Sequence, residues 1–183
     1  MISNFEKALD LVLQSEGGFS INPFDNGNKL PDGRQGCTNK GITQNSWEEF
    51  VGHPVTHNDM RNLTHEQIAK FYKAKFWKLA KCDELPSGVD YVVFDFSVNA
   101  GVGRAVKTLQ QSIGVSADGF IGAVTLSELA KCNTPTLISK FSEKKIEFYQ
   151  DLVARKPDQQ IFLKGWLNRV SSAKQNADAL VSH

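Results

Sequence analysis

Glu16 has the residue type and the position that general acid catalysis requires. It lies seven residues after Leu9 and eleven after Phe5, so it continues the apolar face of the helix that this spacing predicts. Two glycines follow it and end the helix, because glycine adopts left-handed backbone angles without penalty. A carboxyl group beside apolar neighbours is partly removed from water, which favours the protonated form that a general acid needs. The alternative is a glutamate that turns into solvent at a frayed helix end.

The cysteines and histidines form no comparable pattern. The chain has three cysteines: Cys37, Cys82 and Cys132. They are far apart and include no C-x-x-C pair, which argues against a disulfide framework or a zinc knuckle. His53 and His57 have the spacing of one helical turn, but Pro54 lies between them and breaks the helix that would align them. We therefore expect no metal site and no cofactor.

The elements that must position Glu16 are mostly helices. Helical apolar patterns cover residues 42–52, 63–80, 103–114, 134–155 and 161–180, and residues 116–130 hold a tight turn and another helix. Residues 89–101 are almost wholly apolar, which fits a buried central helix or a buried strand, and their length and Gly101 favour the helix. In the second of these, we expect Thr64 to cap the helix with Gln67 as its partner, and Leu79 to lie on the apolar side. Residues 19–41 are rich in Asn, Asp, Gly and Pro, which is typical of a loop or short hairpin. The sequence predicts a mainly α fold with at most a small β-hairpin between residues 19 and 43.

The length and net charge of the chain, with its apolar runs, restrict the classes of partner. The chain has 183 residues, enough for one good core or two small, closely packed lobes. Its formal net charge of +1 gives no support for a nucleic-acid-binding protein. No apolar run approaches the roughly 20 residues of a membrane span, and Glu6 and Asp10 interrupt the apolar residues that a signal peptide needs. We expect no nucleic-acid partner, no stable membrane insertion and no signal peptide.

Several short motifs occur in a fixed order along the chain. They are Glu16-Gly17-Gly18, Asn22-Pro23 with Asp25, and Thr38-Asn39-Lys40-Gly41-Ile42-Thr43. Later matches are Phe76-Trp77, Cys82-Asp83, Leu85-Pro86, Phe94-Asp95-Phe96, Val98-Asn99 and Gly101. Together they resemble the signature of glycoside hydrolase family 108, which comprises phage endolysins and bacterial muramidases. A last group, Asp118-Gly119, Gly122, Thr125 and Gly165 to Val170, resembles the companion peptidoglycan-binding-like segment of that family.

The resemblance implies a lysozyme-like helical fold in two segments. Residues 1–93 correspond to the lysozyme-like catalytic segment, and residues 94–183 to the peptidoglycan-binding-like helical segment. The apolar run Val89–Val98 adjoins the second segment without a linker, so we expect the two to pack as one globule. The implied substrate is peptidoglycan. The implied reaction is cleavage of the β-1,4 bond between N-acetylmuramic acid and N-acetylglucosamine by an N-acetylmuramidase.

The resemblance also implies roles for three residues. Cleavage of a glycosidic bond requires an acid that protonates the leaving oxygen, and a second group that stabilises the oxocarbenium-like centre or activates a water. Glu16 suits the acid. Asp25, in a polar loop, suits a partner that stays ionised, but it can instead be an Asx-turn residue before an Asn-Gly pair. Thr38 can take the second role by orienting a water.

Further motif residues are candidates for substrate binding: Asn39, Thr43, Trp77 and Asn99. Trp77 can stack on a sugar ring, or it can belong to the core as one aromatic residue of a helical stripe. Asn99 follows a buried apolar run, so it either pins the core through hydrogen bonds or faces the cleft.

Two departures from the family pattern lie between the motifs. Residues Asn28 to Gln35 are an insertion, which leaves open the position of Asp25 relative to Thr38. Lys40 replaces the usual tyrosine and adds a positive charge that attracts an anionic polymer.

Other interpretations of the sequence remain open. One is a lytic transglycosylase, which acts on the same bond with one acidic residue and no water. Another is a non-catalytic cell-wall-binding module, against which Glu16 argues. We expect a monomer that stays in the host cytoplasm until it is released to the periplasm and cell wall. The family context implies that a separate holin-type pore releases it.

Overall fold

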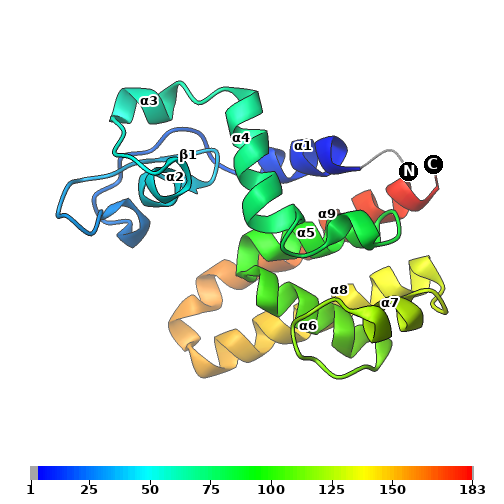
Figure 1. The fold of residues 1–183 in the computed structure, drawn as a ribbon. Coiled ribbons are helices and arrows are strands. Elements are labelled where there is room, and N and C mark those ends of the chain that lie inside the picture. Colours follow the sequence, from blue (N-terminus) through cyan, green and yellow to red (C-terminus); the bar gives the residue numbers. More distant parts are fainter. Residues whose placement is uncertain (1–3, 183) are drawn as a thin grey trace. The chain divides into compact units, whose positions relative to one another are not determined.

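The computed structural model describes residues 4–182, which form two compact units (Figure 1). The N-terminal unit is Phe5–Lys75, and the C-terminal unit comprises Asn4 and the described residues from Phe76 onward. The boundary between the units falls inside the short π-helix Lys73–Trp77. Each unit has its own set of elements and its own buried side chains.

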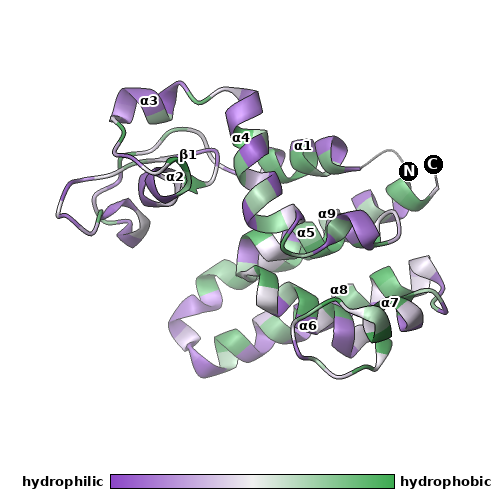
Figure 2. Cartoon of the chain, viewed as in Figure 1, coloured by the Kyte–Doolittle hydropathy of each residue, from purple (hydrophilic) through white to green (hydrophobic). Residues whose placement is uncertain are grey.

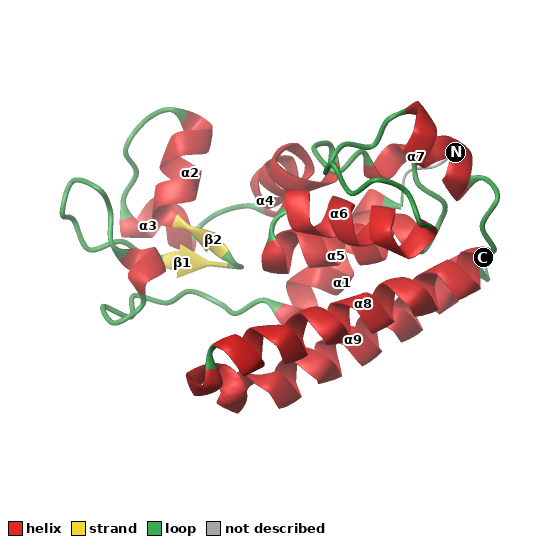
Figure 3. Cartoon of the chain, turned by 90° about the horizontal axis from the view of Figure 1, so that it is seen from below, coloured by secondary structure: helices red, strands yellow, loops and turns green. Residues whose placement is uncertain are grey.

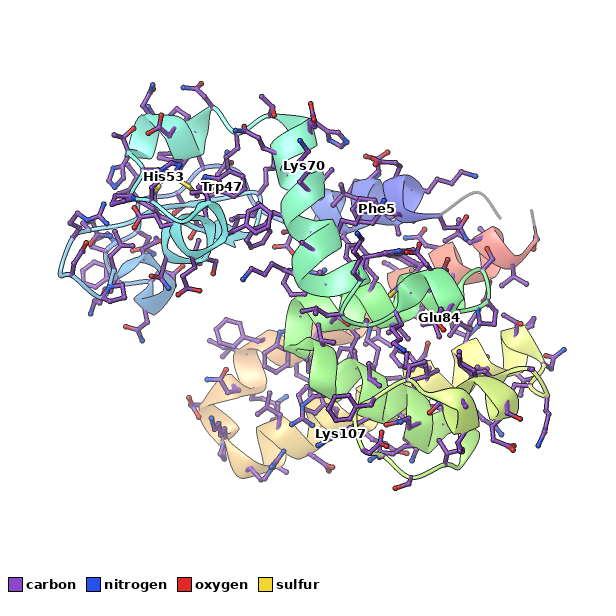
Figure 4. The ribbon with its side chains drawn as sticks, viewed as in Figure 1. Phe5, Trp47, His53, Lys70, Glu84 and Lys107 are labelled. Atoms are coloured by element: carbon purple, nitrogen blue, oxygen red, sulfur yellow. The ribbon has the colours of Figure 1, made fainter. Side chains whose placement is uncertain are left out.

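Short helices and a small hairpin make up the N-terminal unit. Its elements are α1 (Phe5–Ser15), the 3-10 helix η1 (Asn26–Asn28), β1 (Thr38–Asn39), β2 (Ile42–Thr43), α2 (Gln44–Val51), α3 (His57–Arg61) and α4 (His65–Tyr72). Helix α1 contacts α4, and it buries Phe5 (labelled in Figure 4) and Leu9 at the spacing that the sequence predicts. Rings from α2 and α4 complete this core, with Trp47 5.5 Å from Phe50 and 6.1 Å from Phe71 between ring centroids.

The hairpin is tight and antiparallel. Its residue pairs are Thr38–Thr43 and Asn39–Ile42. Lys40 and Gly41 form the turn, with φ of +50° and +77°, and positive φ at both central residues is the geometry of a type I′ turn. Ser20 exchanges two backbone hydrogen bonds with Thr38, so the chain after α1 is attached to the hairpin. The prediction of a small hairpin between residues 19 and 43 is confirmed.

Helix α4 is shorter than the sequence predicts. Thr64 and Gln67 form the expected capping box. The apolar pattern predicts helix through residue 80, but the α-helix ends at Tyr72 and the chain continues as a π-helix over Lys73–Trp77. A π-turn holds more residues than an α-turn and therefore shifts the phase of every residue after it. Leu79 consequently leaves the apolar face and is 64% exposed, so its predicted burial is wrong.

The C-terminal unit is a helical bundle. Its elements are the 3-10 helix η3 (Cys82–Glu84), α5 (Val89–Ala100), α6 (Val102–Ile113), α7 (Ala123–Leu129), α8 (Thr134–Arg155), the 3-10 helix η4 (Pro157–Gln159) and α9 (Gln160–Val181). Helix α5 contacts α6, α8 and α9 and is buried along most of its length. The long helices α8 and α9 lie side by side (Figure 3). Polar and apolar residues alternate along both (Figure 2), because one face of each packs inward.

The predicted segment boundary between residues 93 and 94 lies within α5, which runs unbroken from Val89 to Ala100. Residues 1–3 and 183, the outer ends of the two predicted segments, lie outside the described part of the chain. The apolar run of α5 packs with the helices that follow it. The packing of segments 1–93 and 94–183 as one globule stays a prediction.

A charged group is buried inside the bundle. Asp95 on α5 accepts from Nζ of Lys145 on α8 and from Nη2 of Arg169 on α9, each at 3.1 Å. The side chains of Asp95 and Lys145 are each 2% exposed. Burial lowers the pKa of Lys145, and the neighbouring Asp95 carboxylate partly opposes this effect. The charges are therefore stable in the core only as a set.

No helix among residues 4–182 combines the length and apolarity that a membrane crossing needs.

The three cysteines differ in burial. Cys37 and Cys82 are buried and Cys132 is half-buried, all with free thiols. Cys132 donates from Sγ to the carbonyl oxygen of Glu128 at 3.3 Å. Cys37 likewise donates from Sγ to Oε1 of Gln44 at 3.5 Å, so both thiols act as weak hydrogen-bond donors.

Candidate active site

Glu16 lies directly after α1, where the chain leaves the helix. Its backbone N–H donates to the carbonyl oxygen of Leu13 at 3.2 Å, and its side chain is half-buried. The buried residues of α1 form one face, and Glu16 continues that face beyond the last turn. Its position agrees with the helical phase that the sequence predicts.

The turn of the hairpin leaves room for the Glu16 carboxyl group. A Cβ atom at Gly41 would lie 2.8 Å from Oε2 of Glu16 and 2.6 Å from the hydroxyl oxygen of Tyr72, distances that real Cβ atoms do not adopt. A carboxyl group, a phenol and a backbone turn therefore meet at one point. The Tyr72 hydroxyl donates to the carbonyl oxygen of Lys40 at 2.7 Å, which fixes the turn against α4.

Tyr72 is a site residue that the sequence does not single out. It belongs to the apolar stripe of α4, and it is 1% exposed. A buried tyrosine needs a hydrogen-bond partner for its hydroxyl, and this requirement is the signal that the sequence offers. The partner itself, a carbonyl 32 residues away, is set by the tertiary fold.

Asp25 lies in the loop between α1 and β1 and is exposed. Its Oδ1 accepts from the backbone N–H of Gly27 at 2.9 Å, and it caps the 3-10 helix η1. This is the Asx-turn arrangement given above as its alternative role. The loop reaches the hairpin, because a Cβ atom at Gly27 would lie 3.4 Å from Cγ2 of Thr43. Asp25 and Glu16 therefore approach opposite ends of the same hairpin.

Thr38 is fixed by a residue of the insertion. Its hydroxyl donates to Oδ1 of Asn28 at 2.6 Å, and Nδ2 of Asn28 donates to the carbonyl oxygen of Asn22 at 3.0 Å. Asn28 is 1% exposed. Because the Thr38 proton is committed to Asn28, the lone pairs of the hydroxyl are left to accept a hydrogen bond. A water that donates to Thr38 would have its own lone pair available for attack on a sugar.

The rest of the insertion is an ordered second turn. Lys29 pairs with Gln35 as an isolated bridge, and Arg34 makes two hydrogen bonds to the carboxylate of Glu48 on α2, at 3.1 and 2.8 Å. The Arg34 guanidinium holds the pKa of Glu48 below its usual range. Asp32 accepts from Arg34 as a turn residue. The insertion therefore ties the Asp25 loop to Thr38 and to α2.

The side chains of Asn39 and Thr43 are used within the N-terminal unit. Asn39 is 7% exposed and donates to the carbonyl oxygens of Met60 and Arg61 at 2.9 and 3.4 Å, which attaches β1 to α3. Thr43 caps α2 by accepting from the backbone N–H of Ser46 at 3.2 Å. These contacts explain the two motif residues as supports of the hairpin. Their contact with substrate stays a prediction.

Trp77 and Asn99 belong to the C-terminal unit. Trp77 is 1% exposed, its indole N–H donates to Asp83 at 2.8 Å, and its ring lies 5.4 Å from that of Phe94 in an edge-on contact. A ring enclosed in this way has no face open to a sugar, so its surroundings favour the core alternative. Asn99 is exposed near the end of α5, so it does not pin the core.

Within residues 4–182, no group of three or more His, Cys, Asp or Glu side chains is arranged to hold a metal ion. His53 and His57 make separate contacts, with the carbonyl oxygens of Pro54 at 3.0 Å and Gln35 at 2.8 Å. The His57 contact therefore joins α3 to the insertion, whereas the His53 contact is local to its own loop.

Comparison with known proteins defines the class of this chain. Residues 9–101 match the family Glycosyl hydrolase 108, and residues 104–171 match the family Predicted Peptidoglycan domain. The first match covers more than half of the chain, which therefore belongs to glycosyl hydrolase family 108. The solved structure of Brucella abortus SagA is similar, with a TM-score of 0.81 and 32% identity over 98% of this chain and 97% of that one. No curated protein matches the sequence.

These findings confirm the family and the fold class that the sequence predicts. The fold is mainly α and lysozyme-like, with one two-stranded sheet in the described residues. The second family match confirms the predicted C-terminal peptidoglycan-binding-like segment.

Proposed function

We propose that this chain hydrolyses the β-1,4 bond between N-acetylmuramic acid and N-acetylglucosamine in peptidoglycan, with Glu16 as the general acid. Family membership makes the chain a glycoside hydrolase. The peptidoglycan-domain match over residues 104–171 supports peptidoglycan as its substrate. The particular bond and the role of Glu16 are the further steps of this proposal.

The observation that carries the proposal is the meeting of Glu16, Gly41 and Tyr72. The half-buried carboxyl group lies against Gly41, which has no side chain, and the turn that contains Gly41 is held by the Tyr72 hydroxyl. A general acid must stay within hydrogen-bond reach of the leaving oxygen. A carboxyl group that contacts a fixed turn on one side is positioned to protonate a glycosidic oxygen presented on its other side.

Two groups are candidates for the second role. Thr38, with its proton committed to Asn28, can accept a hydrogen bond from a water and orient it. Asp25 uses one carboxylate oxygen in its turn, which leaves the other to stabilise positive charge on the sugar. Inverting and retaining mechanisms both need such a partner.

The test compares Glu16→Gln with the unchanged protein in a turbidity assay on permeabilised Gram-negative cells. The substitution keeps the shape and removes the proton donor, so we expect a loss of about 10²- to 10⁴-fold. Glu6→Gln, an exposed change on the same helix, is the matched control and should keep full activity. Residual activity of Glu16→Gln above about one per cent would refute the role of Glu16.

Product analysis separates the proposal from its nearest alternative. Hydrolysis leaves a reducing end on N-acetylmuramic acid, whereas a lytic transglycosylase leaves a 1,6-anhydro ring. Reducing ends support the proposal, and anhydro products would replace it with the transglycosylase. A chain that binds peptidoglycan but releases neither product would be a wall-binding module.

A further inference from the structure

A polar groove lies between α6 and α8 in the C-terminal unit, among residues that the proposed reaction does not use. Its volume is about 610 Å³. A second cavity of about 440 Å³ continues from it and shares Gln111, Gly114, Lys144 and Glu147 with it. Residues that line the groove all fall within the 104–171 match to the peptidoglycan domain.

Arg104 on α6 is the most distinctive group in this groove. Its guanidinium carbon lies 4.5 Å from the ring centroid of Phe148 on α8. This cation–π contact restrains the guanidinium group, whose N–H groups stay open to solvent because the side chain is exposed. Arg104 is exposed and pairs with no carboxylate of the described residues. A pre-oriented N–H fork of this type matches a carboxylate with two parallel hydrogen bonds.

The rest of the groove carries both signs of charge. Lys144 and Glu147 form an ion pair at 2.9 Å, and Asp151 and Arg155 lie further along the same helix. The exposed carboxylates suit an ammonium group, and Arg104 suits a carboxylate. The matching ligand is therefore a short zwitterionic chain with several carboxylates.

We propose that this groove binds the stem peptide of peptidoglycan, with Arg104 on one of its carboxylates. Charges in peptidoglycan lie on the stem peptide, which carries a D-glutamyl carboxylate and a diamino acid with both ammonium and carboxylate groups. The sugars present mainly hydroxyl and amide groups, for which open aromatic faces suit better than a charged groove. Here the Phe148 face is covered by Arg104. The proposal rests on peptidoglycan as the substrate and adds a second point of attachment to it.

In the test, the whole chain is titrated with the tripeptide L-alanyl-γ-D-glutamyl-meso-diaminopimelate. Binding is measured by calorimetry and by the amide NMR shifts of residues in α6 and α8. We expect saturable binding. Arg104→Ala should weaken the tripeptide affinity by about tenfold or more, because a charge-assisted pair is lost. Arg104→Lys should keep only part of the unchanged protein's affinity. Lys107→Ala removes the same charge from α6 outside the groove (Lys107 is labelled in Figure 4) and should change affinity less than about twofold.

A kinetic measurement separates this proposal from the proposed reaction. On intact sacculi, Arg104→Ala should raise KM and leave kcat unchanged, whereas on glycan strands stripped of peptides it should change neither. Absence of tripeptide binding, or equal losses for Arg104→Ala and Lys107→Ala, would overturn the groove proposal even if Glu16-dependent cleavage holds. Conversely, Arg104-dependent tripeptide binding in a chain that releases no cleavage product would sustain this proposal and reject the other.

Discussion

Replacing Gly41 by alanine should disable the site by moving its acid. Ordinary contact with a Cβ atom begins at 3.4 Å, and the new atom would lie 2.8 Å from Oε2 of Glu16 and 2.6 Å from the Tyr72 hydroxyl. The two oxygens must therefore retreat by about 0.6 and 0.8 Å. A displacement of about 1 Å can cost about 10²-fold in rate, so we expect activity to fall by about 30- to 100-fold. Alanine at φ of +77° also strains the backbone by about 1–2 kcal/mol.

A matched variant separates the clash from the strain. Gly33 has φ of +87°, and a Cβ atom added there would meet no other atom within 4 Å, so Gly33→Ala carries the same strain without the clash. Initial rates of lysis and urea unfolding should be measured for both. We expect the strain to cost both variants about 1–2 kcal/mol of unfolding free energy, the clash to add to that loss in Gly41→Ala, and only Gly41→Ala to lose activity. Equal activity of the two variants would refute the placement of Glu16 against the turn.

Further predictions concern the fixed threonine and the buried charges. Asn28→Ala should lower kcat by about tenfold or more. The double variant with Asn28→Ala and Thr38→Val should be no slower than Thr38→Val alone. Additive losses in this double-mutant cycle would show that Asn28 does not act through Thr38. Asp95→Ala should reduce the unfolding free energy by about 3–5 kcal/mol by leaving Lys145 uncompensated, and adding Lys145→Met should recover part of that loss in urea titrations; no recovery would contradict the pairing. Burial raises the pKa of Tyr149 to about 12. The protonated phenol therefore contributes about 2 kcal/mol to the unfolding free energy below pH 10, and this contribution is lost between about pH 10 and 12. Tyr149→Phe should flatten that decline, as unfolding at several alkaline pH values will show.

The sequence predicts those parts of the fold and of the site that depend on local periodicity. Glu16 follows from the phase of α1, and Thr64 and Gln67 form the capping box because its chemistry lies within four neighbouring residues. The long apolar run of α5 correctly predicts a buried helix. In each case, the contacts that decide the structure are close in the chain.

The features that escape prediction depend on distant contacts. Tyr72 reaches a carbonyl 32 residues away, and Asn28 reaches Thr38 across ten residues. A polar residue in an insertion gives no sign of such a partner before the fold is known. The π-helix after Tyr72 likewise changes the helical phase without a proline or glycine to mark it, which is why the apolar pattern assigns Leu79 to the wrong face.

The buried thiols determine how the chain responds to oxidants. Burial raises the pKa of Cys37 and raises that of Cys82 well above its usual value. Both side chains therefore remain protonated at neutral pH, and the thiolate is the form that attacks disulfides and peroxides. Because both side chains are also closed off from solvent, at 0% and 1% exposure, oxidation at these two positions is slow. Oxidants should therefore modify Cys132, the half-buried thiol, before either of the two buried ones.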